Sequence, residues 1–74
     1  MTRHPAGEQL LRYFEFGHLP RYLQAVSAPA ARLAHEMFHT LPDGPELTAG
    51  LRKLLEAKDC FVRAALEREP EDKS

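Results

Sequence analysis

Apolar residues recur every three or four positions through the middle of this chain, the spacing that marks one face of a helix. From Pro20 onward they lie at Tyr22, Val26, Ala30, Leu33, Met37 and Leu41. Pro29 interrupts the stripe, because proline removes the hydrogen bond to the carbonyl four residues earlier. Ser27 is a suitable N-cap for a fresh helix with this proline in its first turn. The pattern predicts a short helix near residues 20–26 and a longer one near 28–41, kinked or offset.

A second stripe follows a break in the pattern. The break is LPDGPE, residues 41–46, where two prolines and a glycine end the first helical segment. Asp43 with Glu46 three residues later has the spacing of a capping box. The next helix is expected to run to about Glu67, with apolar residues at Leu47, Leu51, Leu54, Leu55, Phe61, Val62, Ala65 and Leu66. Because the connection is short, we predict an all-α fold, an antiparallel helical hairpin within a domain spanning 10–67.

The segments around the hairpin differ in composition. Residues 1–9 are polar with an early proline and glycine, and are predicted to be a flexible N-terminal arm. Residues 68–74 are predicted to be a flexible polar tail. LLRYFEF, residues 10–16, is the aromatic-richest stretch and is expected to be extended or a single turn rather than a long helix. The hairpin is thus preceded by a short aromatic segment.

The length and charge of the chain limit what it does. Its 74 residues are enough for one small domain. Part of the apolar surface of its two amphipathic helices would stay exposed in a single chain, so other copies of the chain are expected to complete the bundle. The single cysteine, Cys60, excludes an internal disulfide and is interpreted as a small buried or interface residue. A formal charge of −1 argues against DNA binding. No apolar run approaches the roughly 20 residues of a membrane span, so we expect a soluble, intracellular protein without a membrane partner.

The stretch LAHEMFHT, residues 33–40, contains H-E-x-x-H, the zinc signature of many metalloproteases. Two histidines four residues apart on a helix can reach one zinc ion, with the glutamate as general base. Such a site needs a third ligand, and the metzincin continuation requires glycine and histidine where this chain has Pro42 and Pro45. We therefore predict no catalysis, no cofactor and no bound metal, and a solvated or inter-subunit face made of His35, Glu36 and His39.

Aromatic and basic residues are the remaining candidates for ligand contact. Tyr13, Phe14 and Phe16 are expected to be either lids on the core or a platform on which a nucleobase stacks. Lys58 lies at the edge of the apolar stripe. There a lysine either extends out of an interface or meets a phosphate at a subunit seam.

The order of these motifs resembles a known family. It consists of an aromatic F-x-F/Y segment (14–16), a helix beginning at L-P (19–20), a proline-marked turn followed by E-L (41–47), and L-x-K-L-x-E-A-x-D-x-x-V-R-A (51–64). Together these are similar to the small helical-hairpin family of phage-encoded nucleotide sponges, the anti-CBASS and anti-Thoeris hairpin proteins. The similarity covers about residues 14–66.

The resemblance implies a non-catalytic homo-oligomer, typically a hexamer, in the host bacterial cytoplasm. It implies sequestration of cyclic di- or trinucleotides or cyclic ADP-ribose isomers, which keeps an anti-phage defence system off. It also implies base stacking by Phe16, phosphate contact by Arg32 next to Ala31, and a second, trinucleotide pocket at Arg63. His18 and Lys53 complete the candidate ligand-binding residues. The alternative is an oligomeric protein–protein interaction module, or a structural or regulatory subunit, without a nucleotide ligand.

Overall fold

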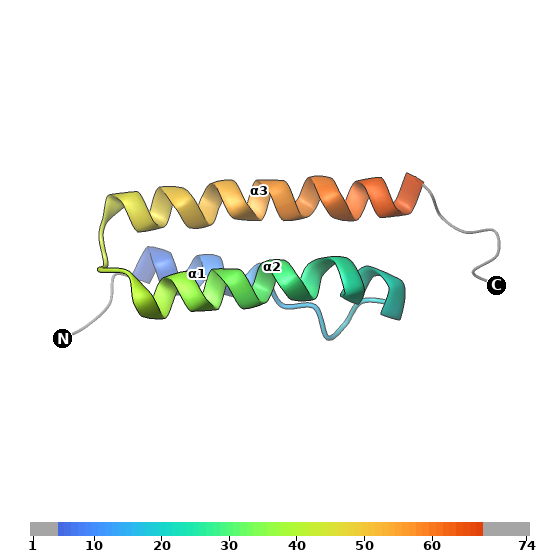
Figure 1. The fold of residues 1–74 in the computed structure, drawn as a ribbon, viewed down its shortest axis with the longest axis horizontal. Helices are drawn as coiled ribbons and strands as arrows, with labels where there is room; N and C mark the ends of the chain where they lie inside the picture. The colour runs from blue at the N-terminus through green and yellow to red at the C-terminus, as the bar shows by residue number, and fades with distance from the viewer. Residues whose placement is uncertain (1–4, 68–74) are drawn as a thin grey trace.

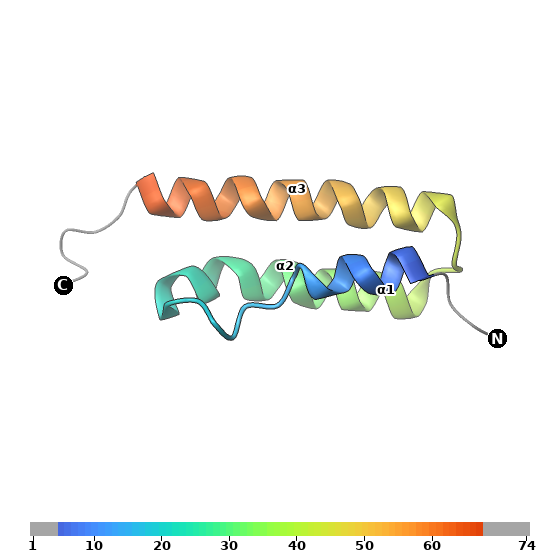
Figure 2. The ribbon, with the colours of Figure 1, turned by 180° about the vertical axis from the view of Figure 1, so that it is seen from behind.

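The computed structural model describes residues 5–67, and every regular element in that range is a helix (Figure 1). The helices are α1 (Pro5–Arg12), α2 (Arg21–Thr40) and α3 (Pro45–Glu67). α2 and α3 lie side by side and run in opposite directions, and α1 packs against both near their connection (Figure 1, Figure 2). The predicted all-α class is confirmed. None of the three helices is long and apolar enough to cross a membrane.

α2 is one helix of 20 residues, so the prediction of two helices broken near Pro29 is wrong. Pro29 and Ala25 are both exposed, which lets water bind the carbonyl that the proline leaves without a helical partner. Ser27, the predicted N-cap, lies in the middle of the helix and is 1% exposed. The helix begins instead after Pro20, whose carbonyl accepts a hydrogen bond from the Gln24 N–H at 2.9 Å.

α1 corrects the predicted arm, because residues 5–9 belong to this helix. Eight residues are too few for a stable isolated helix, so α1 depends on packing. Gly7 is buried, and a Cβ added there would lie 3.1 Å from the Phe38 ring, so glycine permits the close approach of α1 to α2. Residues 1–4 of the predicted arm and the predicted tail 68–74 lie outside the described residues.

Tight turns after α1 carry the aromatic segment. The N–H groups of Tyr13, Phe14 and Glu15 each donate to the carbonyl three residues earlier, at 3.1, 3.0 and 3.2 Å. These turns lead the chain toward α2 and leave Phe14 fully buried, at 0% exposure. The segment is therefore helical up to Arg12 and a succession of turns beyond it.

The core lies where the three helices meet. Its buried apolar residues are Leu10, Phe14, Ala31, Ala34, Phe38, Leu47 and Leu51. α3 supplies only Leu47 and Leu51 to this set, both near its N-terminal end. Farther along the same helix, Phe61 is 58% exposed.

The connection between α2 and α3 lies where it was predicted, and α3 reaches Glu67, the last described residue. The helix starts at Pro45, and the Gly44 carbonyl accepts a hydrogen bond from the Thr48 N–H at 3.1 Å. A capping box with Asp43 as N-cap requires the first helical residue at Gly44. The predicted start is therefore one residue early.

Candidate ligand-binding clefts

A cleft of about 580 Å³ lies beside the turn that joins α1 to α2. One face of α2 forms one side of it through Ala31, Arg32 and His35, which helical spacing places together. Its remaining lining residues are Phe14, Glu15, Phe16, Gly17 and His18. The structure thus brings together three of the five predicted binding residues, Phe16, His18 and Arg32. We call this the Phe16–Arg32 cleft.

The aromatic residues divide between the two predicted roles. Phe14 is a core residue, as the lid interpretation requires. Phe16 is half-buried, packs against the core from outside and also lines the cleft, so it is placed to contact a ligand. Tyr13 is 64% exposed and does not line this cleft.

Both signs of charge are present in the Phe16–Arg32 cleft. Arg32 carries a permanent positive charge, and Glu15 is the acidic residue of the lining. Within residues 5–67 the Arg32 guanidinium makes no hydrogen bond or ion pair, so its donors are available to an anion. The exposed imidazoles of His18 and His35 add further hydrogen-bonding groups.

Gln24 holds the turn that carries Phe16 and His18. Its Nε2 donates to the Leu19 carbonyl at 2.8 Å and lies 3.5 Å from the Gly17 carbonyl oxygen. The Leu19 N–H also donates to the Phe16 carbonyl at 3.0 Å. Gln24 was not among the predicted site residues. Its one sequence signal, a glutamine in the first turn of a helix after a glycine-containing loop, is weak.

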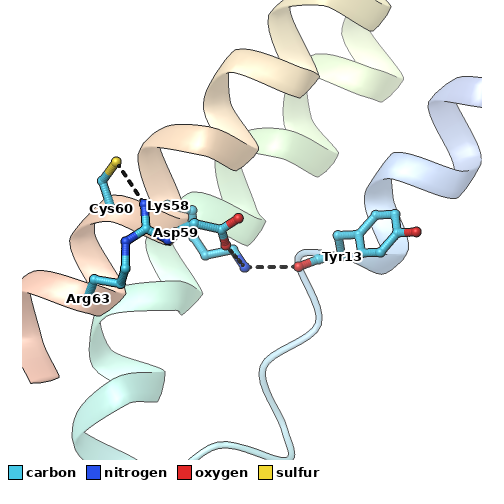
Figure 3. Close-up of polar contacts among 5 residues, drawn as sticks. All are labelled: Tyr13, Lys58, Asp59, Cys60 and Arg63. Atoms are coloured by element: carbon cyan, nitrogen blue, oxygen red, sulfur yellow. Dashed lines mark hydrogen bonds and ion pairs between the residues drawn. The ribbon is translucent and has the colours of Figure 1, made fainter.

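A second cleft, of about 370 Å³, lies between the end of α1 and the C-terminal half of α3. Arg63 lines it, and the guanidinium donates to the Cys60 Sγ at 3.3 Å (Figure 3). Ser27 lines it too, and its buried hydroxyl has no hydrogen-bond partner among the described residues. His18 lines both clefts. The other lining residues are Arg12, Tyr13, Glu15, Leu19, Lys58, Asp59 and Val62.

Lys58 ties α3 to the end of α1. Its Nζ donates to the Tyr13 carbonyl at 3.0 Å and pairs with the Asp59 carboxylate at 2.9 Å (Figure 3). The same Nζ lies 5.9 Å from the centroid of the Phe14 ring, and the side chain is 12% exposed. Of the two interpretations of this lysine, its contacts favour a structural role over phosphate binding.

Two predicted features remain, Lys53 and the H-E-x-x-H stretch, and the stretch reaches the Phe16–Arg32 cleft through His35. Lys53 is exposed and lines neither cleft. The rings of His35 and His39 are stacked with centroids 6.2 Å apart, and both residues are exposed, as is Glu36. Within residues 5–67 no group of three metal-ligating side chains is close enough to hold an ion. The H-E-x-x-H signature therefore has no third ligand in the described part of the chain.

No protein-family model, curated protein or solved structure matches this chain. The resemblance to nucleotide sponges remains a hypothesis based on motifs. The clefts are therefore the physical basis for assigning a function.

Proposed function

We propose that this protein binds a cyclic nucleotide without altering it, and so keeps an immune signal from its receptor. The observation that carries the proposal is the placement of Phe16, His18 and Arg32 in one cleft. An aromatic ring stacks on a base with a contribution of about 1–3 kcal/mol. A guanidinium donates two parallel hydrogen bonds to phosphate oxygens. Base and phosphate are the two chemical groups that every cyclic nucleotide combines.

The size of the cleft supports a ligand of this class. Small-molecule sites have volumes of roughly 300–1,000 Å³, and the Phe16–Arg32 cleft has about 580 Å³. Cyclic di- and trinucleotides and cyclic ADP-ribose isomers are the proposed ligands. Sequestration needs affinity and no chemical step, so the released ligand is expected to be unchanged.

We propose that the hairpin acts as a homo-oligomer. Its exposed apolar residues, which include Phe61 at 58%, Leu66 at 47% and Leu33 at 43%, support association between copies. A cyclic dinucleotide has approximate two-fold symmetry, and a two-fold interface presents each aromatic and each arginine twice. A hexamer built from such dimers is the assembly we propose.

A second candidate function is protein–protein interaction without a nucleotide. The exposed ring of Tyr13, at 64%, lies outside the Phe16–Arg32 cleft and favours a protein partner. In this alternative the oligomer blocks a host protein or serves as a structural or regulatory subunit.

Ligand screening distinguishes the two candidates. We expect a cyclic di- or trinucleotide, or a cyclic ADP-ribose isomer, to raise the melting temperature, since ligand at 100 times its Kd stabilises the native state by about 2.7 kcal/mol. Calorimetric titration then gives the stoichiometry, and mass spectrometry after heat release checks that the ligand is intact. If none of these ligands binds, the interaction module is the better explanation. If a bound ligand returns hydrolysed, sequestration without catalysis is wrong.

Substitutions in the Phe16–Arg32 cleft test which groups bind. We expect Phe16→Ala to weaken binding by roughly 1–3 kcal/mol with little change in salt dependence, since stacking is uncharged. Arg32→Ala removes a charge-assisted contact, so we expect a loss of about 1.5–3 kcal/mol and a flatter dependence of affinity on salt. Arg52→Ala, an exposed change outside both clefts, is the matched control. Wild-type affinity in folded Phe16→Ala and Arg32→Ala would place the ligand elsewhere.

A further inference from the structure

One apolar stripe on α3 is left partly uncovered by α1 and α2. The stripe consists of Leu47, Gly50, Leu54, Ala57, Phe61 and Ala64. Consecutive members are separated by three and four residues in turn, which is the spacing of coiled-coil core positions. Among the large residues of the stripe exposure rises toward the C-terminal end: Leu47 is buried, Leu54 is half-buried and Phe61 is 58% exposed. A stripe of this spacing fits another helix of the same kind.

We infer that this stripe is the seam of an antiparallel homodimer, in which α3 of one copy packs against α3 of a second copy. Large and small residues alternate along it, with Leu47, Leu54 and Phe61 at one coiled-coil position and Gly50, Ala57 and Ala64 at the other. Parallel helices place equal positions opposite each other, which would stack large on large and leave small opposite small. Antiparallel helices place the two positions opposite each other, so every layer pairs a large side chain with a small one.

Large-to-small pairing of Leu54 and Phe61 together allows two antiparallel registers, one centred between residues 55 and 56 and one centred on residue 59. The first places Glu46 beside Glu67 of the second copy, two like charges, so the flanking charges select the second. When Phe61 faces Ala57 of the second copy, the same two-fold axis places Leu54 opposite Ala64 of the second copy, because both pairs are centred on the level of residue 59. Each pair occurs twice, so four consecutive layers match large with small. Close packing of this kind is what protein interiors require.

Charges beside the stripe agree with the same register. Lys53, Cys60 and Glu67 border it at intervals of seven residues, and all three are exposed. In the antiparallel dimer Lys53 lies beside Glu67 of the second copy, and Cys60 beside Cys60 of the second copy. Within residues 5–67 neither Lys53 nor Glu67 makes an ion pair, so both are free for this contact. A parallel dimer would place lysine beside lysine, which flanking positions avoid.

A second copy is the occupant that these observations select. The stripe is complementary to a second copy of itself in side-chain size and in flanking charge. Binding of a different protein would not require such self-complementarity. The seam does not depend on nucleotide binding. It assigns Lys53 to an interface rather than to a ligand cleft, and it explains an exposed Cys60, which was predicted to be either buried or at an interface.

Cross-linking of single-cysteine variants tests the register. In a Cys60→Ser background, we expect a short bismaleimide to join Lys53→Cys to Glu67→Cys when the two variants are mixed. The thiol of each adds across one maleimide double bond and gives a species of twice the 8.4 kDa chain mass. Neither variant alone is expected to cross-link, whereas the wild type is expected to do so through Cys60. Arg52→Cys, exposed on the other side of α3, is the control that should remain uncross-linked.

Phe61→Glu tests the seam by a second measurement. Because Phe61 is exposed in the single chain, we expect the variant to keep its helical circular dichroism while its sedimenting mass falls by at least half. Three results would each overturn the inference. They are a wild type that sediments as a single 8.4 kDa species at micromolar concentration, self-cross-linking of Lys53→Cys without a mixed product between Lys53→Cys and Glu67→Cys, and an oligomer without cross-links at all three positions. Cross-linking reports on folded chains, so it decides the matter even if Phe61→Glu unfolds.

Discussion

The two halves of α3 have similar apolar periodicity and different surroundings. In the first half, Leu47 and Leu51 are buried in one cluster with Phe14 and Phe38. In the second half, Phe61 is 58% exposed. α1 accounts for the difference, because it reaches along the first half only (Figure 2). Amphipathic periodicity therefore shows which face of a helix is suited to a contact, but not whether the same chain supplies that contact.

The largest expected effect comes from changing the phenylalanine packed against the first half, Phe14, and comparing it with the phenylalanine within the second half, Phe61. Phe14→Ala removes a fully buried ring that shares a cluster with Leu47 and Leu51, so we expect a loss of about 3–5 kcal/mol in the free energy of unfolding at every protein concentration. Phe61→Ala removes an exposed ring, and its effect should be confined to the stability gained by association. Urea denaturation at several concentrations measures both.

Equal losses at high dilution from Phe14→Ala and Phe61→Ala would show that Phe61 is already covered within one chain. The contrast between the halves of α3 would then be wrong. A loss from Phe61→Ala that grows with protein concentration would sharpen the contrast.

The same contrast explains which parts of the fold the sequence predicts. α3 and the connection before it follow from strong periodicity and from prolines and glycine, so their positions were predicted closely. α1 was missed because Pro5 and Gly7 were interpreted as marks of a loose arm, although six of the eight residues of PAGEQLLR are good helix formers. So short a helix also needs contacts such as that of Gly7 with Phe38 to be stable. Pro29 was interpreted as a break, but on an exposed face it removes one hydrogen bond and the helix continues. At Pro29 local propensity yielded to tertiary packing, whereas at α1 packing stabilises a helix that local propensity already favours.

The candidate site was predictable in part for similar reasons. Phe16, His18 and Arg32 were predicted, and their residue types are suited to bases and phosphates. That they line one cleft depends on how the turn after α1 lies on α2, which no local pattern specifies. Lys58 was left between two roles because its partner, the Tyr13 carbonyl, is 45 residues away in the chain. Contacts at such separation cannot be deduced from helical periodicity.

An intermediate effect is expected at Lys58, which connects the second half of α3 to the end of α1 through its hydrogen bond to Tyr13. Lys58→Met keeps the aliphatic stem but removes the hydrogen bond to the Tyr13 carbonyl and the charge near the Phe14 ring. A hydrogen bond to a charged group contributes about 1.5–3 kcal/mol, so we expect a loss of that size in the free energy of unfolding. The adjacent Asp59 pair should add little, because surface ion pairs contribute about 0–1 kcal/mol.

Arg52→Met is the matched control for Lys58→Met, since Arg52 is exposed on α3 and a surface change of this kind stays within about 0.5 kcal/mol. If both variants unfold alike, the lysine does not hold α1 to α3. The second half of α3 would then lack its polar contact with the rest of the chain.

The smallest effect, a gain, is expected at Ser27, which lines the second cleft beside the less covered half of α3. Its hydroxyl is buried and has no hydrogen-bond partner within residues 5–67, and such a group destabilises the native state by about 1–3 kcal/mol. Ser27→Ala removes the hydroxyl at the price of a slightly larger cavity, and alanine is also the better helix former. We therefore expect the free energy of unfolding to rise by about 1 kcal/mol in urea denaturation. Thr40→Ala, an exposed change on the same helix, is the control, because it measures the gain from helix propensity without a buried hydroxyl. A smaller gain in the free energy of unfolding from Ser27→Ala than from this control would mean that the Ser27 hydroxyl has a partner in solution.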